Sequence, residues 1–379
     1  MTARATAHDA LQGCMIVVAA DRRSADLATA LERRGAVVQC APALSILPAV
    51  DDEQLMARTR ELIAEPPDVV VVTTGVGLRG WMDAVHQNDL HGGLVSALAR
   101  TRFIARGPKA HGAIQQAGFT ADWVARSETS AEVAEHLLAD AAAGRRIAVQ
   151  HHGAGADELD ERLTRAGAQV VPLTVYRWGP SPDPQIVRRS VQQTAAGAVD
   201  AVLFTSAPGA REWLRIAEAE GVVDRIRVRA DGGRLLLAAV GPVTAAPLDG
   251  ARLPVTIAAR GRLGSLVRCV VEHFSGDAPQ AATAGGDLQV RSGGALLDGR
   301  FLSLSPTSAG ILGALFDAGG RVLSREELGH ALPRGGERAH AVEMAIARLR
   351  DRLGDRLGGA AVVQTVTKRG YRLTTEDLE

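Results

Sequence analysis

The chain has 379 residues, of which 46% are hydrophobic and 23% are charged, and its formal net charge at pH 7 is zero. This composition excludes an intrinsically disordered chain, and a chain of this length is expected to fold as about two or three domains. Because the whole chain is neutral, any affinity for nucleic acid has to come from a local cluster of basic residues.

The three cysteines, Cys14, Cys40 and Cys269, are far apart and form no CxxC pair. Their spacing argues against a disulfide framework and against a zinc site. The segment MTARATAHDALQG at 1–13 has no apolar core, so we expect no signal peptide. No apolar run approaches the roughly 20 residues that a membrane-spanning helix needs. We therefore expect a cytoplasmic protein with no membrane partner.

Residues 14–275 contain an internal repeat. The segment DVVVVTTGVGLRGWM at 68–82 and the segment DAVLFTSAPGAREWL at 200–214 align at an offset of 132 residues. The identical pairs are Asp68/Asp200, Val70/Val202, Thr73/Thr205, Gly77/Gly209, Arg79/Arg211 and Trp81/Trp213. Three further segments recur in the same order at or near this offset. The repeat predicts that both halves of this region have the same fold.

Each half alternates short apolar runs with amphipathic stretches. MIVVAA (15–20), DVVVVTT (68–74), TRFIARG (101–107) and RRIAVQ (145–150) are continuous apolar runs typical of buried strands. The stretch SADLATALERRG has helical spacing, and Gly35 is expected to end that helix. This alternation predicts an α/β fold with two Rossmann-like parallel sheets covered by helices.

The turns after these strands are candidate binding sites, because ligands of open parallel sheets bind at the carboxyl ends of the strands. GVGLRG at 75–80 matches the dinucleotide pattern GxGxxG. The second half keeps only its middle glycine, and no acidic residue follows the next strand to bind a ribose, which disfavours a nucleotide. Thr73-Thr74 and Thr205-Ser206 instead place hydroxyls before helix N-termini, which favours an anion; helix capping alone is the alternative.

The repeated turns, the segment GPVTA at 241–245 and the segment VVPLTVYRW at 170–178 resemble uroporphyrinogen-III synthase. The resemblance covers about residues 14–275. It implies two α/β domains, one made of 14–47 and 178–275 and the other of 49–173. It also implies an active site in the cleft between these domains.

That family cyclises the linear tetrapyrrole hydroxymethylbilane without a cofactor, and it binds this polycarboxylate through backbone amides and hydroxyls. The resemblance therefore implies a tetrapyrrole ligand and no cofactor. The candidate cleft residues are Thr74, Gly75, Lys109, His151, Tyr176, Thr205, Ser206, Gly241 and Thr244, with Arg22, Arg23 and His152 on similar loops. Lys109-Ala110 replaces a hydroxyl-bearing pair of the family pattern, so enzyme and binding protein both stay open. No residue completes a metal site around His151-His152, so we expect no metal.

The segment 276–285 consists of small residues without periodicity and predicts a flexible linker before a domain at 286–374. The predicted elements of that domain are short strands over 287–305, a helix from Ser305-Pro306 to about Ala318, a short helix opened by the capping box Ser324–Glu327, a third helix over about 338–353, and a hairpin over 362–373.

The third helix places Val342, Ile346, Leu349 and Leu353 on one stripe for the core. The outward face and the hairpin provide the candidate DNA contacts, which are Arg338, His340, Glu343, Met344, Ala347, Arg348, Arg350, Thr367, Lys368, Arg369 and Tyr371. Residues 321–372 contain ten Arg and one Lys against six acids, an excess of five positive charges. Such clustering is typical of DNA-binding domains.

The order of strands, three helices and hairpin resembles the OmpR/PhoB-type winged helix-turn-helix. The resemblance rests on LSLSPTSAGILGAL, GRVLSREEL, AVEMAIARLRDRL and TVTKRGYRL. It implies that the helix at 338–353 reads bases and that the hairpin, the wing, contacts the minor groove or phosphates. Thr-Lys-Arg-Gly replaces the usual Gly-rich turn at the wing tip, which alters these contacts.

Two functions are expected from these parts. The first is a transcription regulator that binds promoter DNA as a homodimer, with a body that senses a tetrapyrrole or a partner protein such as a response regulator or RNA polymerase. Fusions of this kind resemble actinobacterial regulators of nitrate and nitrite assimilation. The alternative is an active uroporphyrinogen-III synthase with an appended DNA-binding domain.

Overall fold

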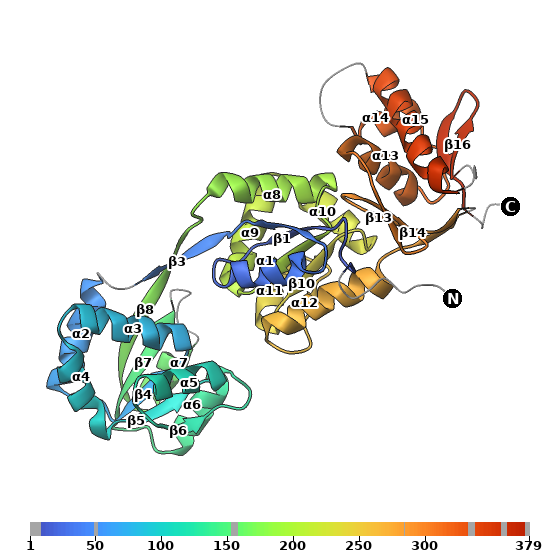
Figure 1. Ribbon diagram of the computed structural model, residues 1–379. Coiled ribbons are helices and arrows are strands. Elements are labelled where there is room, and N and C mark those ends of the chain that lie inside the picture. Colours follow the sequence, from blue (N-terminus) through green and yellow to red (C-terminus); the bar gives the residue numbers. More distant parts are fainter. Residues whose placement is uncertain are drawn as a thin grey trace. The chain divides into compact units, whose positions relative to one another are not determined.

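The computed structural model describes residues 9–48, 52–152, 158–283, 285–332, 338–357 and 362–375 (Figure 1). The chain forms two compact units, which we call unit 1 (Met1–Leu44 with Pro180–Glu379) and unit 2 (Ser45–Gly179). Unit 1 contains a parallel sheet with its helices and also the C-terminal domain. Within the described ranges, no helix is both long and apolar enough to cross a membrane.

The sheet of unit 1 is parallel throughout and has the order β11-β10-β9-β1-β2. Its strands are β1 (Met15–Val18), β2 (Val37–Cys40), β9 (Ala201–Phe204), β10 (Leu236–Ala239) and β11 (Thr256–Ile257). Its helices are α1 (Ser24–Glu32), α8 (Pro184–Ala196), α9 (Ala207–Ala219), α10 (Val223–Asp231), α11 (Pro242–Gly250) and α12 (Leu263–Glu272).

Both faces of this sheet are buried, which explains why its strands are continuous apolar runs. Along β9, Val202 and Phe204 enter the core beneath α8 to α11, whereas Ala201 and Leu203 enter the core beneath α1 and α12. The predicted helix after β1 forms α1, and Gly35 follows it with a φ of +90°, a conformation that favours glycine.

The sheet of unit 2 has the order β3-β8-β7-β4-β5-β6. Its strands are β3 (Leu44–Pro48), β4 (Val69–Val72), β5 (Arg102–Ala105), β6 (Ala121–Val124), β7 (Arg146–His152) and β8 (Gln169–Pro180). Its helices are α2 (Glu53–Ala64), α3 (Gly75–Gln87), α4 (His91–Ala97), α5 (Pro108–Gln116), α6 (Ser130–Ala139) and α7 (Leu159–Arg165). The pairings from β8 to β6 are parallel, which confirms the predicted α/β fold.

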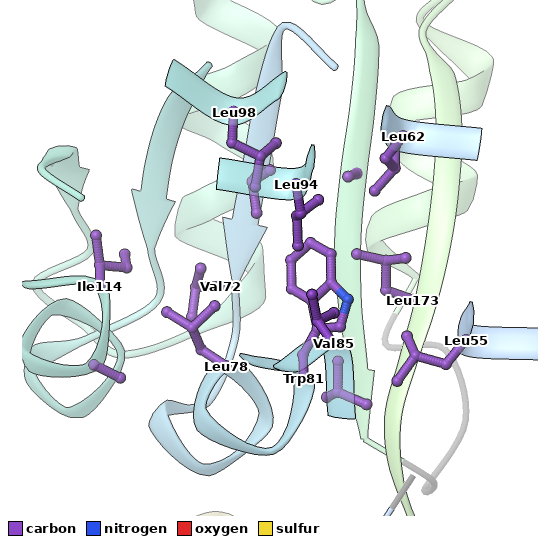
Figure 2. Close-up of a cluster of buried hydrophobic side chains, with 14 of the residues drawn as sticks. Leu55, Leu62, Val72, Leu78, Trp81, Val85, Leu94, Leu98, Ile114 and Leu173 are labelled. Atoms are coloured by element: carbon purple, nitrogen blue, oxygen red, sulfur yellow. The ribbon is translucent and has the colours of Figure 1, made fainter. Parts of the chain in front are cut away.

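The indole of Trp81 lies at the centre of the larger core of unit 2, among leucines and valines from α2, α3, α4, β4 and β8 (Figure 2). Trp81 is fully buried, and its Nε1–H donates to Thr59 Oγ1 at 2.9 Å. Thr59 in turn donates to the Leu55 carbonyl at 2.7 Å. The buried polar groups of α2 and α3 are thus paired, as a core of this kind requires.

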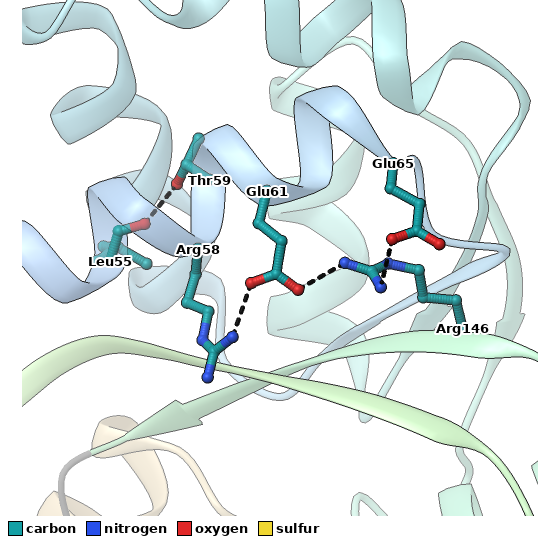
Figure 3. Close-up of polar contacts among 6 residues, drawn as sticks. All are labelled: Leu55, Arg58, Thr59, Glu61, Glu65 and Arg146. Atoms are coloured by element: carbon teal, nitrogen blue, oxygen red, sulfur yellow. Dashed lines mark hydrogen bonds and ion pairs between the residues drawn. The ribbon is translucent and has the colours of Figure 1, made fainter.

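An ion-pair network fastens α2 to the start of β7 (Figure 3). The buried guanidinium of Arg146 contacts Glu61 at 2.7 Å and Glu65 at 3.0 Å, and Arg58 contacts Glu61 at 2.7 Å. The hydrogen bond from Arg58 lowers the pKa of Glu61, with Arg146 adding to the effect. The Glu61 carboxylate is therefore favoured in its ionised form beside the buried arginine.

The C-terminal domain has one core of its own. Its elements are β12 (Ala281–Thr283), β13 (Gly286–Arg291), β14 (Gly294–Leu297), β15 (Arg300–Ser303), α13 (Pro306–Asp317), α14 (Arg325–Gly329), α15 (Arg338–Leu357), β16 (Val363–Val366) and β17 (Gly370–Leu373). Ser305 caps α13, and the predicted capping box of α14 is present, with Ser324 and Glu327 bonding each other's backbone N–H. The winged-helix fold is confirmed, and α15 runs beyond its predicted end at 353.

The prediction of a flexible linker over 276–285 needs correction. A π-helical turn covers His273–Asp277, and Ala281–Thr283 forms β12, which pairs antiparallel with β13. Thr283 Oγ1 also donates to the Gly286 carbonyl at 2.7 Å. Ala281, Ala282 and Thr283 give no periodic apolar signal in so short a strand, and the strand is defined by its pairing with β13.

Candidate nucleic-acid interface and anion-binding turns

Helix α15 presents one face to the core and one to solvent. Val342, Ile346, Leu349 and Leu353 are buried, as predicted. The opposite face exposes His340, Glu343, Met344, Ala347 and Arg348. Met344 on this face is 43% accessible, so its side chain is free to contact a partner.

The acidic residue of this outward face forms an ion pair, whereas its basic residue Arg348 forms none within the described part of the chain. Glu343 contacts the guanidinium of Arg325 on α14 at 2.8 Å, which neutralises the one acid of the predicted reading face. Arg348 is exposed and has no ion pair with any residue in the described ranges. The net effect is a face whose positive charge at Arg348 stands next to apolar Met344 and the small Ala347.

The wing is clamped to the rest of the domain near its second strand. Tyr371 N donates to the Leu323 carbonyl at 2.9 Å, and Leu323 N donates to the Tyr371 carbonyl at 2.8 Å. A Cβ at Gly370 would lie 1.9 Å from the Leu323 oxygen, and its φ is +140°, so only glycine fits there. Thr367, Lys368 and Arg369 are exposed at the wing tip, with Lys368 in the left-handed region at φ +61°.

Two predicted DNA contacts also bind within the domain: Tyr371 is buried, and Arg350 is partly exposed. Tyr371 is only 6% exposed, and the guanidinium groups of Arg325 and Arg350 lie 5.8 and 5.7 Å from its ring centre. Arg350 also donates to the Val363 carbonyl and, at 2.7 Å, to Thr365 Oγ1. These residues hold the wing against α15. The side chain of Arg338 lies outside the described residues.

The sequence did contain a signal for the burial of Tyr371. In a strand, residues two apart point to the same face, and Leu373 is an obvious core residue. Tyr371 therefore shares the buried face with Leu373. Arg350 gave no such signal, because its partners belong to a strand thirteen positions further along the chain.

In unit 2, the predicted turn after β4 brings two helix N-termini together. Thr74 caps α3 by accepting from Gly77 N at 3.1 Å. A Cβ at Gly75 would lie 2.4 Å from the Lys109 carbonyl on α5, so this glycine is required by close packing of two helices. Lys109 itself is exposed. The cap uses one N–H of the first turn, and the others of that turn have no intrahelical acceptor.

His151 and Tyr176 are both engaged within unit 2. His151 Nε2 lies 2.8 Å from Asp160 Oδ2 of α7, with both side chains mostly buried. Tyr176 is buried, with its ring edge-on to Trp178 at 5.9 Å. In the parts of the chain that the structure describes, no three His, Cys, Asp or Glu residues gather as metal ligands would.

In unit 1, the corresponding turns follow the neighbouring strands β9 and β10. Ser206 caps α9 by accepting from Gly209 N at 3.2 Å, and Thr205 before it is half-buried. Gly241 precedes α11 in open space, because a Cβ there would meet nothing within 4 Å, whereas Thr244 is buried. Thr205, Ser206 and Gly241 thus remain accessible beside two helix N-termini, where an anion is favoured.

Comparisons with known proteins match two families to separate parts of the chain. The family model of uroporphyrinogen-III synthase HemD matches residues 25–268, and that of the C-terminal transcriptional regulatory protein domain matches residues 299–373. A mutant uroporphyrinogen III synthase from the extremely thermophilic bacterium Thermus thermophilus is similar in structure, with 26% identity, a TM-score of 0.54, and coverage of 69% of this chain and 98% of that chain.

Two further similar proteins cover different parts of the chain. The DNA-binding domain of Escherichia coli CadC is 31% identical and covers 25% of this chain and 94% of its own, with a TM-score of 0.23. The Bacillus subtilis (strain 168) protein YjjA, described as uncharacterized, is 27% identical over 238 residues, which are 63% of this chain and 87% of that protein.

Proposed function

Because the chain belongs to the uroporphyrinogen-III synthase HemD family and also has a DNA-binding domain of the transcriptional regulator type, we propose that its synthase-like body controls how the winged helix binds promoter DNA. The observation that supports this most directly is the exposed surface of α15 and the wing tip. Arg348, Lys368 and Arg369 are exposed there, while the neighbouring Glu343 is paired with Arg325.

In this proposal, α15 enters the major groove and the wing contacts the backbone. The small Ala347 permits close approach, Met344 suits a thymine methyl group, and the fork of Arg348 suits the two acceptors of a guanine. Lys368 and Arg369 contact phosphates, which adds affinity without sequence preference. Two copies bind together, because winged helices of this kind usually occupy paired half-sites.

Substitutions on the two surfaces test this proposal by fluorescence anisotropy with the promoter upstream of the protein's own gene. Arg348→Ala is expected to weaken specific binding about tenfold or more, as loss of a base contact does. Lys368→Ala should weaken binding to all sequences and reduce the slope of log affinity against log salt by about one. Arg300→Ala, an exposed arginine on β15 of the same domain, is the matched control. Unchanged binding in both variants would refute the assigned DNA surface.

For the body, we propose that carboxylates of a tetrapyrrole bind at the turns after β9 and β10 of unit 1, and that the turn after β4 of unit 2 is a second anion-binding turn by itself. The caps at Thr74 and Ser206 each use one N–H, and the remaining N–H groups of those helix turns suit anions. Uroporphyrin III, added to the full chain and followed by its absorbance, provides the test. Thr205→Val should weaken its binding, whereas Thr164→Val, at an exposed site on α7, should not. Equal binding by both variants would contradict the assignment.

Family membership also supports a second candidate, an active synthase. Incubation with hydroxymethylbilane separates the two, because an enzyme yields uroporphyrinogen III and a sensor leaves the spontaneous type I product. We further propose target promoters in nitrate and nitrite assimilation, because sirohaem, the cofactor of nitrite reductase, is made from uroporphyrinogen III. Failure to bind a nitrite reductase promoter better than an unrelated promoter would remove this part.

A further inference from the structure

A buried carboxylate joins the C-terminal domain to the parallel sheet of unit 1. Asp200, 4% exposed, precedes β9 and accepts from Met15 N of β1 at 2.8 Å. The same carboxylate accepts from Ser292 N at 2.9 Å and from the Ser292 hydroxyl, in the turn between β13 and β14. One side chain therefore connects two strands of the sheet to the DNA-binding domain, and burial raises its pKa.

The neighbouring Arg291 is the second part of this contact. Its guanidinium is almost inaccessible, with the residue 2% exposed. It donates to the carbonyls of Ala10, Gln12 and Phe274 at 3.0, 2.8 and 3.1 Å, and to Gln289 at 2.9 Å. A buried guanidinium is tolerated only when its donors are satisfied. Three of these acceptors belong to the chain before β1 and after α12, so the arginine binds the body rather than its own domain.

Further contacts surround these two residues. Gly293 N donates to the Gly13 carbonyl at 2.9 Å, and the Phe301 ring packs so closely on Gly13 that a Cβ there would lie 2.1 Å from it. Arg234, just before β10, contacts Asp317 at 3.1 Å and lies 5.0 Å from the Phe316 ring centre. Buried polar groups that are paired in this way are typical of a packed interface and not of a flexible tether.

The position of this contact links it to the candidate ligand turn. Asp200 stands at the amino end of β9, a strand of four residues, and Thr205-Ser206 stands at its carboxyl end. β9 is hydrogen-bonded on both sides, to β1 and to β10, and its residues are fully buried. We expect such a strand to shift as one segment, because its pairing on both sides and its close packing oppose local changes.

We propose that Asp200, Arg291 and Ser292 form a docking joint that fixes the winged helix on the parallel sheet of unit 1 and transmits to it displacements of the Thr205–Ser206 turn through β9. The transmission half rests on the proposed function, since it needs a ligand at that turn; the joint itself does not. The docked domain and the sheet then move together. A carboxylate that binds at the carboxyl end of β9, opposite the joint, therefore changes the orientation of α15 through this strand.

Hydrogen exchange of the full chain, without ligand, tests the joint. We expect the Ser292 and Gly293 amides to be protected in the native chain. Asp200→Asn replaces one acceptor oxygen by an N–H donor that faces Met15 N–H or Ser292, so exchange over residues 287–304 should accelerate at least about tenfold. Helices α13 and α15 should keep their protection, which shows that the domain is still folded.

Asp68→Asn is the matched control. Asp68 is the counterpart of Asp200 in the repeat and accepts from Arg146 N at 2.8 Å within unit 2. This variant should leave exchange over 287–304 unchanged. If Asp200→Asn does not fold, Ser292→Ala removes only the hydroxyl and should still accelerate exchange there. Native Ser292 and Gly293 amides that exchange as fast as an unstructured peptide would overturn the joint.

The transmission half has its own readout. Uroporphyrin III is added while binding of the promoter is followed by anisotropy, and any change in affinity is compared between the native chain and Asp200→Asn. Loss of the response in the variant, with DNA affinity retained, supports transmission through β9. An identical response in both chains refutes it. If uroporphyrin III changes nothing in the native chain, the proposed ligand fails, while the exchange result on the joint stands.

Discussion

The two repeats of the body carry the same pair of charged residues but use it differently. Asp68 and Arg102 of unit 2 correspond, at the offset of 132, to Asp200 and Arg234 of unit 1. Both aspartates accept the first backbone N–H of the adjacent strand at 2.8 Å. In unit 2, Arg102 pairs with Asp140 of its own unit, whereas Arg234 pairs with Asp317 of the DNA-binding domain.

Asp68 is open to solvent at its edge of the sheet, whereas Asp200 is covered by the DNA-binding domain. Asp68 borders a pocket of about 470 Å³ whose lining includes Arg100, Arg102 and Arg145. At Asp200 the corresponding edge of the sheet is covered by Ser292. In each repeat one carboxylate oxygen accepts the N–H of the adjacent strand, so the other oxygen can accept a different hydrogen bond. In unit 1 this second acceptor binds Ser292 N of the DNA-binding domain.

The largest expected difference between the two edges is in arginine substitutions. Arg291→Met leaves the Ala10 and Gln12 carbonyls without the donor that Arg291 supplies, and it removes one of the two donors to the Phe274 carbonyl. It should lower the free energy of unfolding by about 3–5 kcal/mol. Arg102→Met removes a pair in which both side chains are about one-third exposed, and should cost less than about 1 kcal/mol. Urea unfolding of the full chain measures both. Similar losses would mean that the buried arginine contributes no more than the exposed one.

A smaller difference is expected at the paired tryptophans. Trp81 donates to Thr59, whereas Trp213 Nε1, packed against Phe204, has no hydrogen-bond partner among the described residues. Replacing each by Phe removes the same ring volume. Trp81→Phe should therefore cost about 1 kcal/mol more than Trp213→Phe, because only it breaks a buried hydrogen bond. Equal losses in urea unfolding would show that this bond adds nothing to stability.

The smallest expected effects concern two carboxylates that accept from serine N–H groups. Burial raises the pKa of Asp200 above its usual value of 3.8, whereas the Ser324 N–H and Arg321 lower the pKa of the exposed Glu327 to about 2. The contribution of Asp200 to stability is thus present at low pH and lost as pH rises through its native pKa. That of Glu327 is present above its usual pKa of 4.5 and lost as pH falls through about 2.

Carboxyl carbon chemical shifts in an NMR titration check this order. On acidification, Asp200 should take up its proton at a higher pH than Glu327. Protonation in the reverse order would mean that burial at the joint is weaker than the contacts imply.

Much of the fold could be predicted from the sequence, because it rests on local patterns. Continuous apolar runs identified strands such as β4 and β5, and the identical residues of the repeat were enough to align Asp68 with Asp200. The core stripe of α15 followed from helical spacing. The assigned ligand turns stay predictions, although Ser206 and Thr74 do cap helices there.

The joint between the domains could not be predicted. Arginine is rarely buried, so nothing in the sequence marks Arg291 as a buried residue. Its acceptors are backbone carbonyls at 10, 12 and 274, and a carbonyl has no sequence signature. Small residues between 276 and 285 favour a loose connection when only local sequence is considered. The contacts that hold this region in place come from residues far apart in the sequence.

The strands that connect the units have a consequence for how such a protein can change over time. The chain enters unit 2 along β3 and leaves it along β8, and these two strands are neighbours in one sheet. Unit 2 is therefore an insertion whose two ends lie side by side, the arrangement in which whole domains are most easily exchanged or removed. Selection on Ser45–Gly179 can alter its chemistry while the DNA-binding part, its docking contacts and its operator preference are inherited intact.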